Sequence, residues 1–118
     1  MRNKNQKYTV LNRNFQFQQV YRKGFSFVSP FVVTYILPRQ GDAVRYGITA
    51  SKKIGCAVER NRARRVIRSA FSSLLPDING AYDFVFVARK ATVAAKSTRL
   101  CAVITEQLKK AGIIRRVE

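Results

Sequence analysis

The sequence predicts an α+β fold, a two-layer α/β sandwich in which helices cover a β-sheet. Stretches with apolar residues three and four positions apart alternate with stretches rich in aromatic and β-branched residues. Hydrophobic residues make up 47% of the 118 positions, which is enough for one domain with a substantial core. We expect a single domain over residues 1–118, with basic, flexible ends at residues 1–7 and 113–118. Its expected order is helix, three strands, helix, strand, helix.

The first helix is predicted to end at Lys23, because a basic last turn is followed there by Gly24. Asn12 or Asn14 is expected to cap its start. Its apolar residues, some of them three or four positions apart, are Phe15, Phe17, Val20 and Tyr21.

Three strands are predicted after this helix. Ser29 and Pro30 divide an aromatic and β-branched run into a short strand and a longer one over residues 31–37. Turn residues at positions 38–42 then lead to a strand over residues 44–50. We expect the longer strand and this one to pair as an antiparallel hairpin.

A second helix is predicted in the most distinctive stretch, residues 51–68, which holds seven basic residues and one acid, Glu59. Gly55 permits a sharp entry into the helix, and Pro76 is expected to stop it. At about 100° per residue, one arc gathers Ala63, Val66, Ile67, Ala70, Phe71 and Leu74. The neighbouring arc holds Arg60, Asn61, Arg64, Arg65 and Arg68, and Arg62 lies apart from both. The helix should therefore pack on one side and offer a rigid arginine row on another.

The strand over residues 82–88 follows a turn with a strong Asn-Gly signal at residues 77–80. Its alternation is imperfect, so it is expected to be central and covered on both faces. The last helix runs from Ser97 to Ala111 and ends at Gly112. Its buried face is predicted to carry Leu100, Val103, Ile104 and Leu108.

The charge is extreme for a folded domain: 23 Lys and Arg against 6 Asp and Glu give a net charge of +17 and a pI near 11.0. A polyanionic partner is the usual reason, with nucleic acid first and an acidic membrane second. No apolar run approaches the roughly 18 residues of a membrane span. Because no signal peptide is recognisable behind the basic N-terminus, we expect a cytoplasmic location.

The residues that usually carry catalysis are missing or scattered. The chain has no histidine, the commonest general base and metal ligand. Cys56 and Cys101 show no metal spacing, and we interpret both as reduced, partly buried thiols. No pair of acids has the spacing of shared metal coordination; the acids are Asp42, Glu59, Asp77, Asp83, Glu106 and Glu118. We therefore expect no catalytic residue and no metal site in the polypeptide itself.

Nucleic-acid binding fits the basic helix better. Arginine on a rigid helix can form bidentate bonds to phosphate, whereas a merely solvated helix face usually mixes charge signs. Asn61 is either a plain surface residue or a contact to a base edge or ribose hydroxyl. Phe17, Tyr21 and Tyr35 either belong to the core or stack on unpaired bases. The phenylalanines expected in the core are Phe15, Phe71, Phe84 and Phe86.

The block RNRARR at residues 60–65, preceded by SKKIG and by Ala57 and Val58, resembles the signature of the bacterial ribonuclease P protein subunit. The resemblance extends to FQQVYRKG (17–24), the strand that contains Tyr35, RYGITASKK (45–53) and FVFVARK (84–90). It covers nearly the whole chain in the right order. Two departures are mild: Tyr21 stands where phenylalanine is frequent, and Arg64 stands where lysine is common.

This resemblance implies a fold similar to domain 2 of ribosomal protein S5, with an unusual left-handed βαβ crossover around the arginine helix. It also implies a catalytic RNA as partner. The holoenzyme would remove the 5′ leader of precursor tRNA, with Mg²⁺ required through the RNA and no cofactor bound by the protein alone. Neither a membrane nor DNA is an expected partner.

The resemblance also assigns residues to two binding roles. Contacts to the catalytic RNA are expected from Lys53, Arg60, Asn61, Arg62, Arg64, Arg65 and Arg68. A cleft between the first helix and the sheet is expected to hold the single-stranded leader. Its residues would be Phe17, Tyr21, Tyr35, Ser51, Lys52, Arg89 and Lys90. Stacking and phosphate contacts suit leaders of differing sequence, because every base has a face to stack.

Two other classes of protein share some of these features. A ribosomal or other structural RNA-binding protein could have the same charge and α+β layout. A DNA-binding or membrane-active basic protein is less well matched, since the long strands are unlike a helix-turn-helix. The RNA that copurifies with the protein would separate these alternatives.

Overall fold

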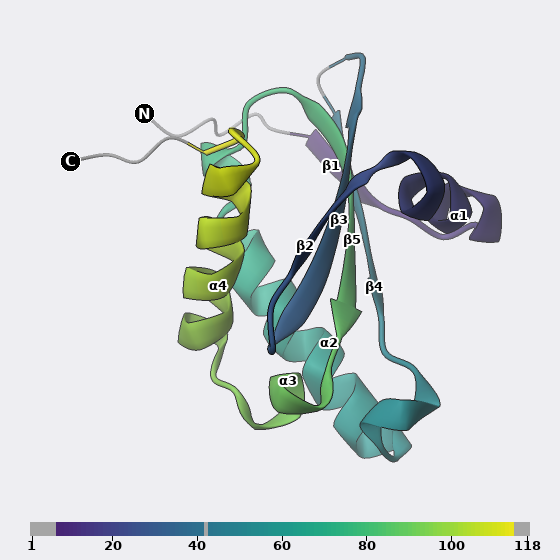
Figure 1. The fold of residues 1–118 in the computed structure, drawn as a ribbon, viewed down its shortest axis with the longest axis vertical. Helices are drawn as coiled ribbons and strands as arrows, with labels where there is room; N and C mark the ends of the chain where they lie inside the picture. Colours follow the sequence, from purple (N-terminus) through teal and green to yellow (C-terminus); the bar gives the residue numbers. More distant parts are fainter. Residues whose placement is uncertain (1–6, 42, 115–118) are drawn as a thin grey trace.

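The computed structural model describes residues 7–41 and 43–114, so the predicted flexible ends at residues 1–6 and 115–118 lie outside the described residues, as does Asp42. The helices and strands, in chain order, are β1 (Lys7–Val10), α1 (Asn14–Lys23), β2 (Phe25–Val28), β3 (Val32–Arg39), β4 (Ala43–Thr49), the 3-10 helix η1 (Lys52–Ile54), α2 (Ala57–Ser72), the 3-10 helix η2 (Leu75–Asp77), β5 (Ala81–Ala88), α3 (Lys90–Ala94) and α4 (Ser97–Lys110). The strands form one sheet in the order β1-β4-β5-β3-β2 (Figure 1).

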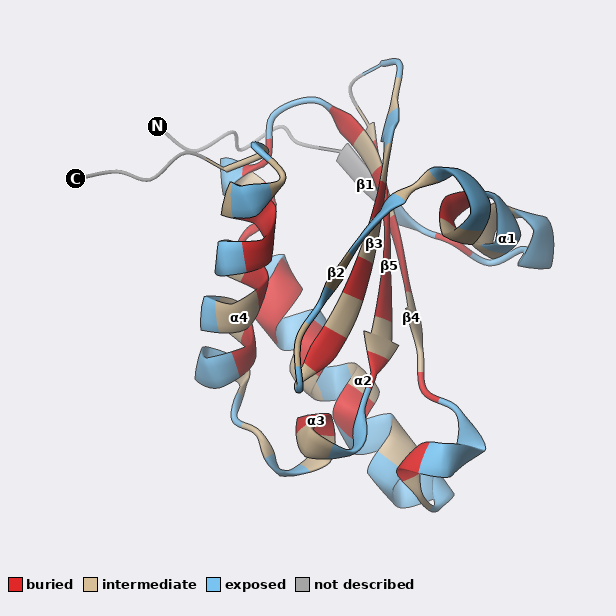
Figure 2. Cartoon of the chain, viewed as in Figure 1, coloured by how far each residue is buried: buried red, intermediate tan, exposed pale blue. Residues whose placement is uncertain are grey.

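The predicted α+β sandwich is confirmed, with the main core between the sheet and helices α2 and α4 (Figures 1 and 2). Phe71 of α2 lies at its centre, with its ring centroid 5.1 Å from that of Phe84 and 4.8 Å from that of Phe86. Helix α1 crosses the opposite face of the sheet over a smaller cluster of Leu11, Val20 and Val85. The sheet is therefore covered by helices on both faces, with different helices on each.

Strand β5 is central, as predicted, because it pairs with β4 on one side and with β3 on the other. The predicted hairpin between the strands at residues 31–37 and 44–50 is wrong. These strands correspond to β3 and β4, and β5 lies between them, antiparallel to β3 and parallel to β4. The parallel pair β4 and β5, joined through α2, forms a βαβ unit consistent with the left-handed crossover that the resemblance implies.

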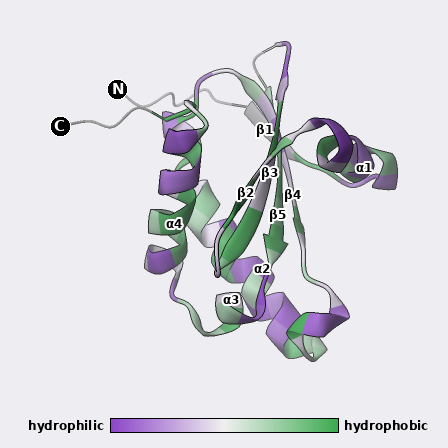
Figure 3. Ribbon diagram, in the orientation of Figure 1, coloured by the Kyte–Doolittle hydropathy of each residue, from purple (hydrophilic) through white to green (hydrophobic). Residues whose placement is uncertain are grey.

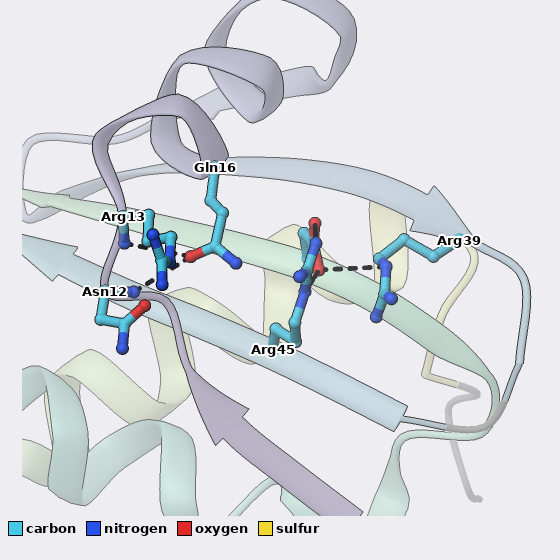
Figure 4. A network of polar contacts seen from close by, with 6 residues as sticks. Asn12, Arg13, Gln16, Arg39 and Arg45 are labelled. Atoms are coloured by element: carbon cyan, nitrogen blue, oxygen red, sulfur yellow. Dashed lines mark hydrogen bonds and ion pairs between the residues drawn. The ribbon is translucent and has the colours of Figure 1, made fainter.

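The start of α1 differs from the prediction of an asparagine cap. Arg13 is the N-cap residue, and the Gln16 side chain caps the helix: its Oε1 accepts from the backbone N–H groups of Asn12 and Arg13, each at 3.1 Å (Figure 4). The predicted end at Lys23 is confirmed. A Cβ on Gly24 would lie 2.6 Å from the Val20 carbonyl oxygen, so this glycine allows a close backbone approach rather than a left-handed turn.

Other corrections concern element ends and short elements. Lys7, assigned to the flexible arm, begins β1, and residues 113–114 pack against the core. Pro38 belongs to β3 rather than to the turn. Helix α2 ends at Ser72, so η2 rather than a continuing helix contains Pro76. Two short elements, η1 and α3, were not predicted from the sequence.

Phe15 is not in the core, because 64% of it is exposed. It lies about 200° around the helix from Phe17, and so points away from the sheet that Phe17 contacts. The predicted burial of Phe71, Phe84 and Phe86 is confirmed. Both cysteines are free thiols, but Cys56 is exposed rather than partly buried.

Helix α4 is attached to the sheet by apolar packing and by one buried polar residue. Its hydrophobic side faces the sheet and its hydrophilic side faces outward (Figure 3). Leu100, Ile104 and Leu108 are buried as predicted, and Val103 is half-buried. Gln107, also buried, accepts a hydrogen bond from Thr34 Oγ1 at 2.6 Å and donates Nε2–H to the Phe27 and Val32 carbonyls. These bonds fix the register of α4 against strands β2 and β3.

Candidate nucleic-acid interface

One side of α2 is buried in the core, so the residues that α2 offers to a partner lie on its other side. Ala63, Ile67, Ala70 and Phe71 are buried against the sheet and α4. Among the remaining polar residues, Asn61, Arg62, Arg65 and Arg68 are exposed, whereas Arg60 and Arg64 are half-buried. We call these six residues, together with exposed Lys53 of η1, the arginine surface.

Three arginines of the arginine surface are positioned by neutral acceptors. Arg60 donates to the Gly55 carbonyl at 2.8 Å, Arg62 Nε donates to the Val93 carbonyl at 2.9 Å, and Arg64 donates to Asn61 Oδ1 at 3.1 Å. Within the described part of the chain, no salt bridge joins any arginine of α2 to a carboxylate. Their positive charges are therefore ordered but not neutralised, as an anion-binding surface requires.

The one acid of α2 is used at the start of the helix. Glu59 Oε1 accepts from the backbone N–H of Cys56, the N-cap residue, at 3.0 Å. Gly55, with φ at 147°, makes the sharp entry that the sequence predicted. Any side chain there would be strained and would also meet the Glu59 carboxylate. A carboxylate at a helix N-terminus is favourable, and it leaves the arginines further along the helix unpaired.

The predicted leader-binding aromatics meet on the opposite face of the sheet. Phe17 and Tyr21 of α1 and Tyr35 of β3 pack around the small cluster under α1, and each remains half-buried. The Tyr21 and Tyr35 rings are in edge contact, with centroids 4.9 Å apart. The rings therefore pack against the core and still present surface to solvent, and their stacking on unpaired bases stays a prediction.

Gly47 of β4 determines how close Phe17 lies to the sheet. A Cβ at Gly47 would lie 2.4 Å from Phe17 Cζ, so only a glycine accommodates the ring in this position. This role of Gly47 was not predicted from the sequence. The signal was present as a glycine in the interior of a predicted strand, which often marks a close approach of this kind.

The polar residues assigned to the leader lie at the ends of two neighbouring strands. Because β4 and β5 are parallel, Ser51 and Lys52 after β4 reach the same edge of the sheet as Arg89 and Lys90 after β5, and all four are exposed. Gly47 is the residue that Phe17 contacts. At roughly 3.3 Å per residue, Ser51 lies about 13 Å from Gly47 along the strand direction. The structure therefore places the four polar residues predicted to bind the leader at one end of the sheet. The three predicted aromatics lie on the sheet face that α1 covers.

Thr92 holds the turn that carries Arg89 and Lys90. Its buried hydroxyl accepts from the Arg89 backbone N–H at 2.9 Å and donates to the Phe31 carbonyl. This contact ties the start of α3 to the region just before β3. Thr92 and Phe31 are 61 residues apart, so no local sequence pattern predicts their contact.

The α1 face also carries an ion-pair cluster that was not predicted in detail. Asp83 of β5, 1% exposed, accepts from Arg45 Nε and Nη2 at 2.8 and 2.7 Å, and Arg39 Nε lies 3.5 Å from its Oδ1 (Figure 4). The hydrogen bonds to Asp83 raise the pKa of the Arg45 guanidinium, although burial acts in the opposite direction. This carboxylate is structural, and it links three strands of the sheet.

Among residues 7–41 and 43–114, no cluster of three His, Cys, Asp or Glu residues could hold a metal ion. No helix in this described part has the length and hydrophobicity needed to cross a membrane.

The arginine surface on one sheet face and the half-buried aromatics on the other define a class: a basic α+β protein suited to a polyanionic partner. The family model described as Ribonuclease P matches residues 6–112. A Ribonuclease P protein component from Halalkalibacterium halodurans is 38% identical over 105 residues, covering 88% of this chain and 88% of that protein. Another from Clostridioides difficile is 42% identical over 80 residues, covering 67% and 70%. The chain belongs to the Ribonuclease P protein family, which confirms the resemblance.

Solved structures agree with this assignment. The RNase P protein of Staphylococcus aureus superposes with a TM-score of 0.77 at 31% identity, covering 90% of this chain and 97% of that one. The RNase P protein of Thermotoga maritima gives a TM-score of 0.74, covering 85% and 94%, and at 23% identity it supports the fold alone.

Proposed function

We propose that this chain is the protein subunit of a bacterial ribonuclease P, the ribonucleoprotein that removes the 5′ leader from precursor tRNA. The observation that carries the proposal is the arginine surface: three of its arginines are ordered by neutral acceptors, and none of its arginines is paired with a described carboxylate. In this proposal the arginine surface binds the catalytic RNA, which cleaves the substrate. The protein works in the cytoplasm and supplies no catalytic residue.

The second surface is assigned to the leader of the precursor. Stacking on Phe17, Tyr21 and Tyr35, with phosphate contacts at the basic end of the sheet, would hold a single strand without reading its sequence. The basic end comprises Ser51, Lys52, Arg89 and Lys90. Because mature tRNA has no leader, these contacts favour precursor over product.

The expected role of Mg²⁺ follows from the same charges. The protein binds no metal alone in this proposal, and the catalytic RNA holds the ions required for cleavage. Lysine and arginine that neutralise RNA phosphates replace part of the cation atmosphere, so the holoenzyme should need less Mg²⁺ than the RNA alone.

The proposal is tested by cleavage of a precursor tRNA with purified components. The protein freed of RNA should cleave nothing, and adding it to the ribonuclease P RNA should restore cleavage at Mg²⁺ concentrations where the RNA alone is slow. Robust cleavage by the isolated protein would contradict the proposal. So would ribosomal RNA, without ribonuclease P RNA, as the only species that copurifies with it from cells.

Replacing Phe17 by alanine is expected to weaken binding of precursor tRNA, because one stacking ring is lost. The expected loss is about 1–3 kcal/mol, with the affinity for mature tRNA nearly unchanged. Binding of both tRNAs to the assembled holoenzyme measures the effect. The matched control is Phe15→Ala, which removes a ring that points away from the sheet on the same helix.

Because Phe17 also packs under α1, a second variant separates stacking from folding. Phe17→Leu keeps apolar volume against Gly47 but removes the aromatic face. It should retain the stability of the wild type and still lose the preference for precursor. If Phe17→Leu binds precursor as tightly as the wild type, the ring serves only the core and the leader assignment is wrong.

A further inference from the structure

A groove of about 560 Å³ runs between α2 and the start of α4, beside the arginine surface. Its polar lining comes from two helices and consists of Arg62, Arg65, Ser69, Lys96, Ser97 and Thr98. Three of these side chains are cationic and three carry hydroxyl groups. None of the described residues that line the groove is acidic. This composition suits the oxygens of a phosphate group.

Arg62 is held at this groove by the chain that leads into α4. Its Nε donates to the Val93 carbonyl at 2.9 Å, which leaves its two terminal nitrogens available for another acceptor. At about 100° per residue, Arg62 and Arg65 lie only about 60° apart on α2, whereas Arg64 lies about 160° from Arg62. The groove is lined by Arg62 and Arg65 and not by Arg64 or Arg68, so the edge of the arginine surface that carries Arg62 and Arg65 faces it.

The basic surface continues beyond this groove along α4. A second groove of about 580 Å³ shares Lys96 and Thr98 with the first and is lined further on by Arg99 and Phe31. The Arg99 guanidinium carbon lies 5.6 Å from the centre of the Phe31 ring, a cation–π contact that orders this arginine. Lys96 lines both grooves, so it connects Arg62 and Arg65 of α2 with Arg99 of α4.

We propose that this groove binds the phosphodiester backbone of the catalytic RNA and extends the RNA contact from α2 onto the start of α4. The inference rests on the proposed function. The catalytic RNA is the occupant because the groove adjoins the arginine surface, on the sheet face opposite Phe17, Tyr21 and Tyr35. Backbone rather than base contact follows from the lining of the first groove, which joins cations and hydroxyl groups with no aromatic ring.

The matched pair Lys96→Ala and Lys110→Ala tests the proposal, because both are exposed lysines at opposite ends of α4. Each lowers the net charge by one, so long-range attraction falls equally. In a titration of the catalytic RNA, Lys96→Ala should raise Kd about three- to tenfold and lower the salt slope by about one. Lys110→Ala should leave both near wild-type values, and Lys96→Arg should restore them. Equal effects of the two alanine variants would overturn the proposal.

A measurement on the wild-type complex removes any dependence on how the variants fold. Acetylation of lysines followed by mass spectrometry should find Lys96 protected in the complex and Lys110 modified as in the free protein. Modification of Lys96 at the same rate with and without the RNA would overturn the inference. Protection of Lys96 only when precursor tRNA is added would do the same, since it would assign the groove to the substrate. If the wild-type protein does not bind the ribonuclease P RNA at all, the result contradicts the proposed function and not only the assignment of this groove.

Discussion

Replacing Arg62 and Arg65 together by alanine is expected to weaken assembly with the catalytic RNA by about 3 kcal/mol, roughly 100-fold in Kd. Both side chains are exposed, and neither is paired with a described carboxylate, so each charge is available to phosphate. The slope of log K against log salt should fall by about two, since each arginine neutralises about one phosphate. Binding titrations at several salt concentrations measure both quantities.

The control for this pair is the double variant Arg13→Ala with Arg22→Ala. It removes the same charge from exposed arginines at α1, on the other face of the sheet. The control should alter assembly only slightly. If both double variants weaken assembly equally, the interaction depends on total charge, and α2 has no special role. Circular dichroism should show an unchanged fold, because neither Arg62 nor Arg65 packs in the core.

Asp83→Ala is expected to lower the free energy of unfolding by about 3–5 kcal/mol, because it leaves Arg45 largely buried without its anion. The side chain of Asp83 is 2% exposed and that of Arg45 is 24% exposed. A domain of ordinary stability, about 5–15 kcal/mol, would lose a large fraction of it. Urea denaturation measures the change.

Asp77→Ala is the matched control for Asp83→Ala, since it removes an exposed carboxylate and changes the net charge by the same amount. It should cost well under about 1 kcal/mol. Similar stabilities for the two variants would show that Asp83 does not hold the sheet together.

Bonding to Asp83 raises the pKa of Arg45, so the stabilisation from this ion pair is present below the unfolded-state pKa of Arg45. It is lost only as pH rises through the folded-state pKa of Arg45. The difference in unfolding free energy between Asp83→Ala and Asp77→Ala should therefore persist from neutral to moderately alkaline pH.

The parts of the fold that depend on local pattern could be predicted from the sequence. The three-and-four spacing of α2 gave its buried arc, and the absence of acids beyond Glu59 predicted its outer side to be the basic surface. The position of β5 at the centre followed from its nearly continuous apolar run. Phe15 could also have been placed outside, because it lies opposite Phe17 on a helical wheel.

What the sequence could not show depends on contacts between distant residues. Strands β3 and β4 are consecutive, yet β5 is inserted between them, and no local signal reports this. Strand β1 has four residues at the sheet edge, too few for a clear alternation. The Arg45–Asp83 pair and the groove between α2 and α4 join residues at least 25 positions apart, so only the folded chain brings them together.

The sheet has one further consequence, since its two faces carry the two surfaces that we propose bind RNA. Residues that alternate along β3 and β5 point to opposite sides, so a substitution that reshapes the aromatic side need not disturb α2. If both surfaces act as proposed, natural selection could change which substrates are favoured while the contact with the catalytic RNA stays constant. Leader sequences and the aromatic side of the protein could then change together during evolution, without a new mode of assembly with the RNA.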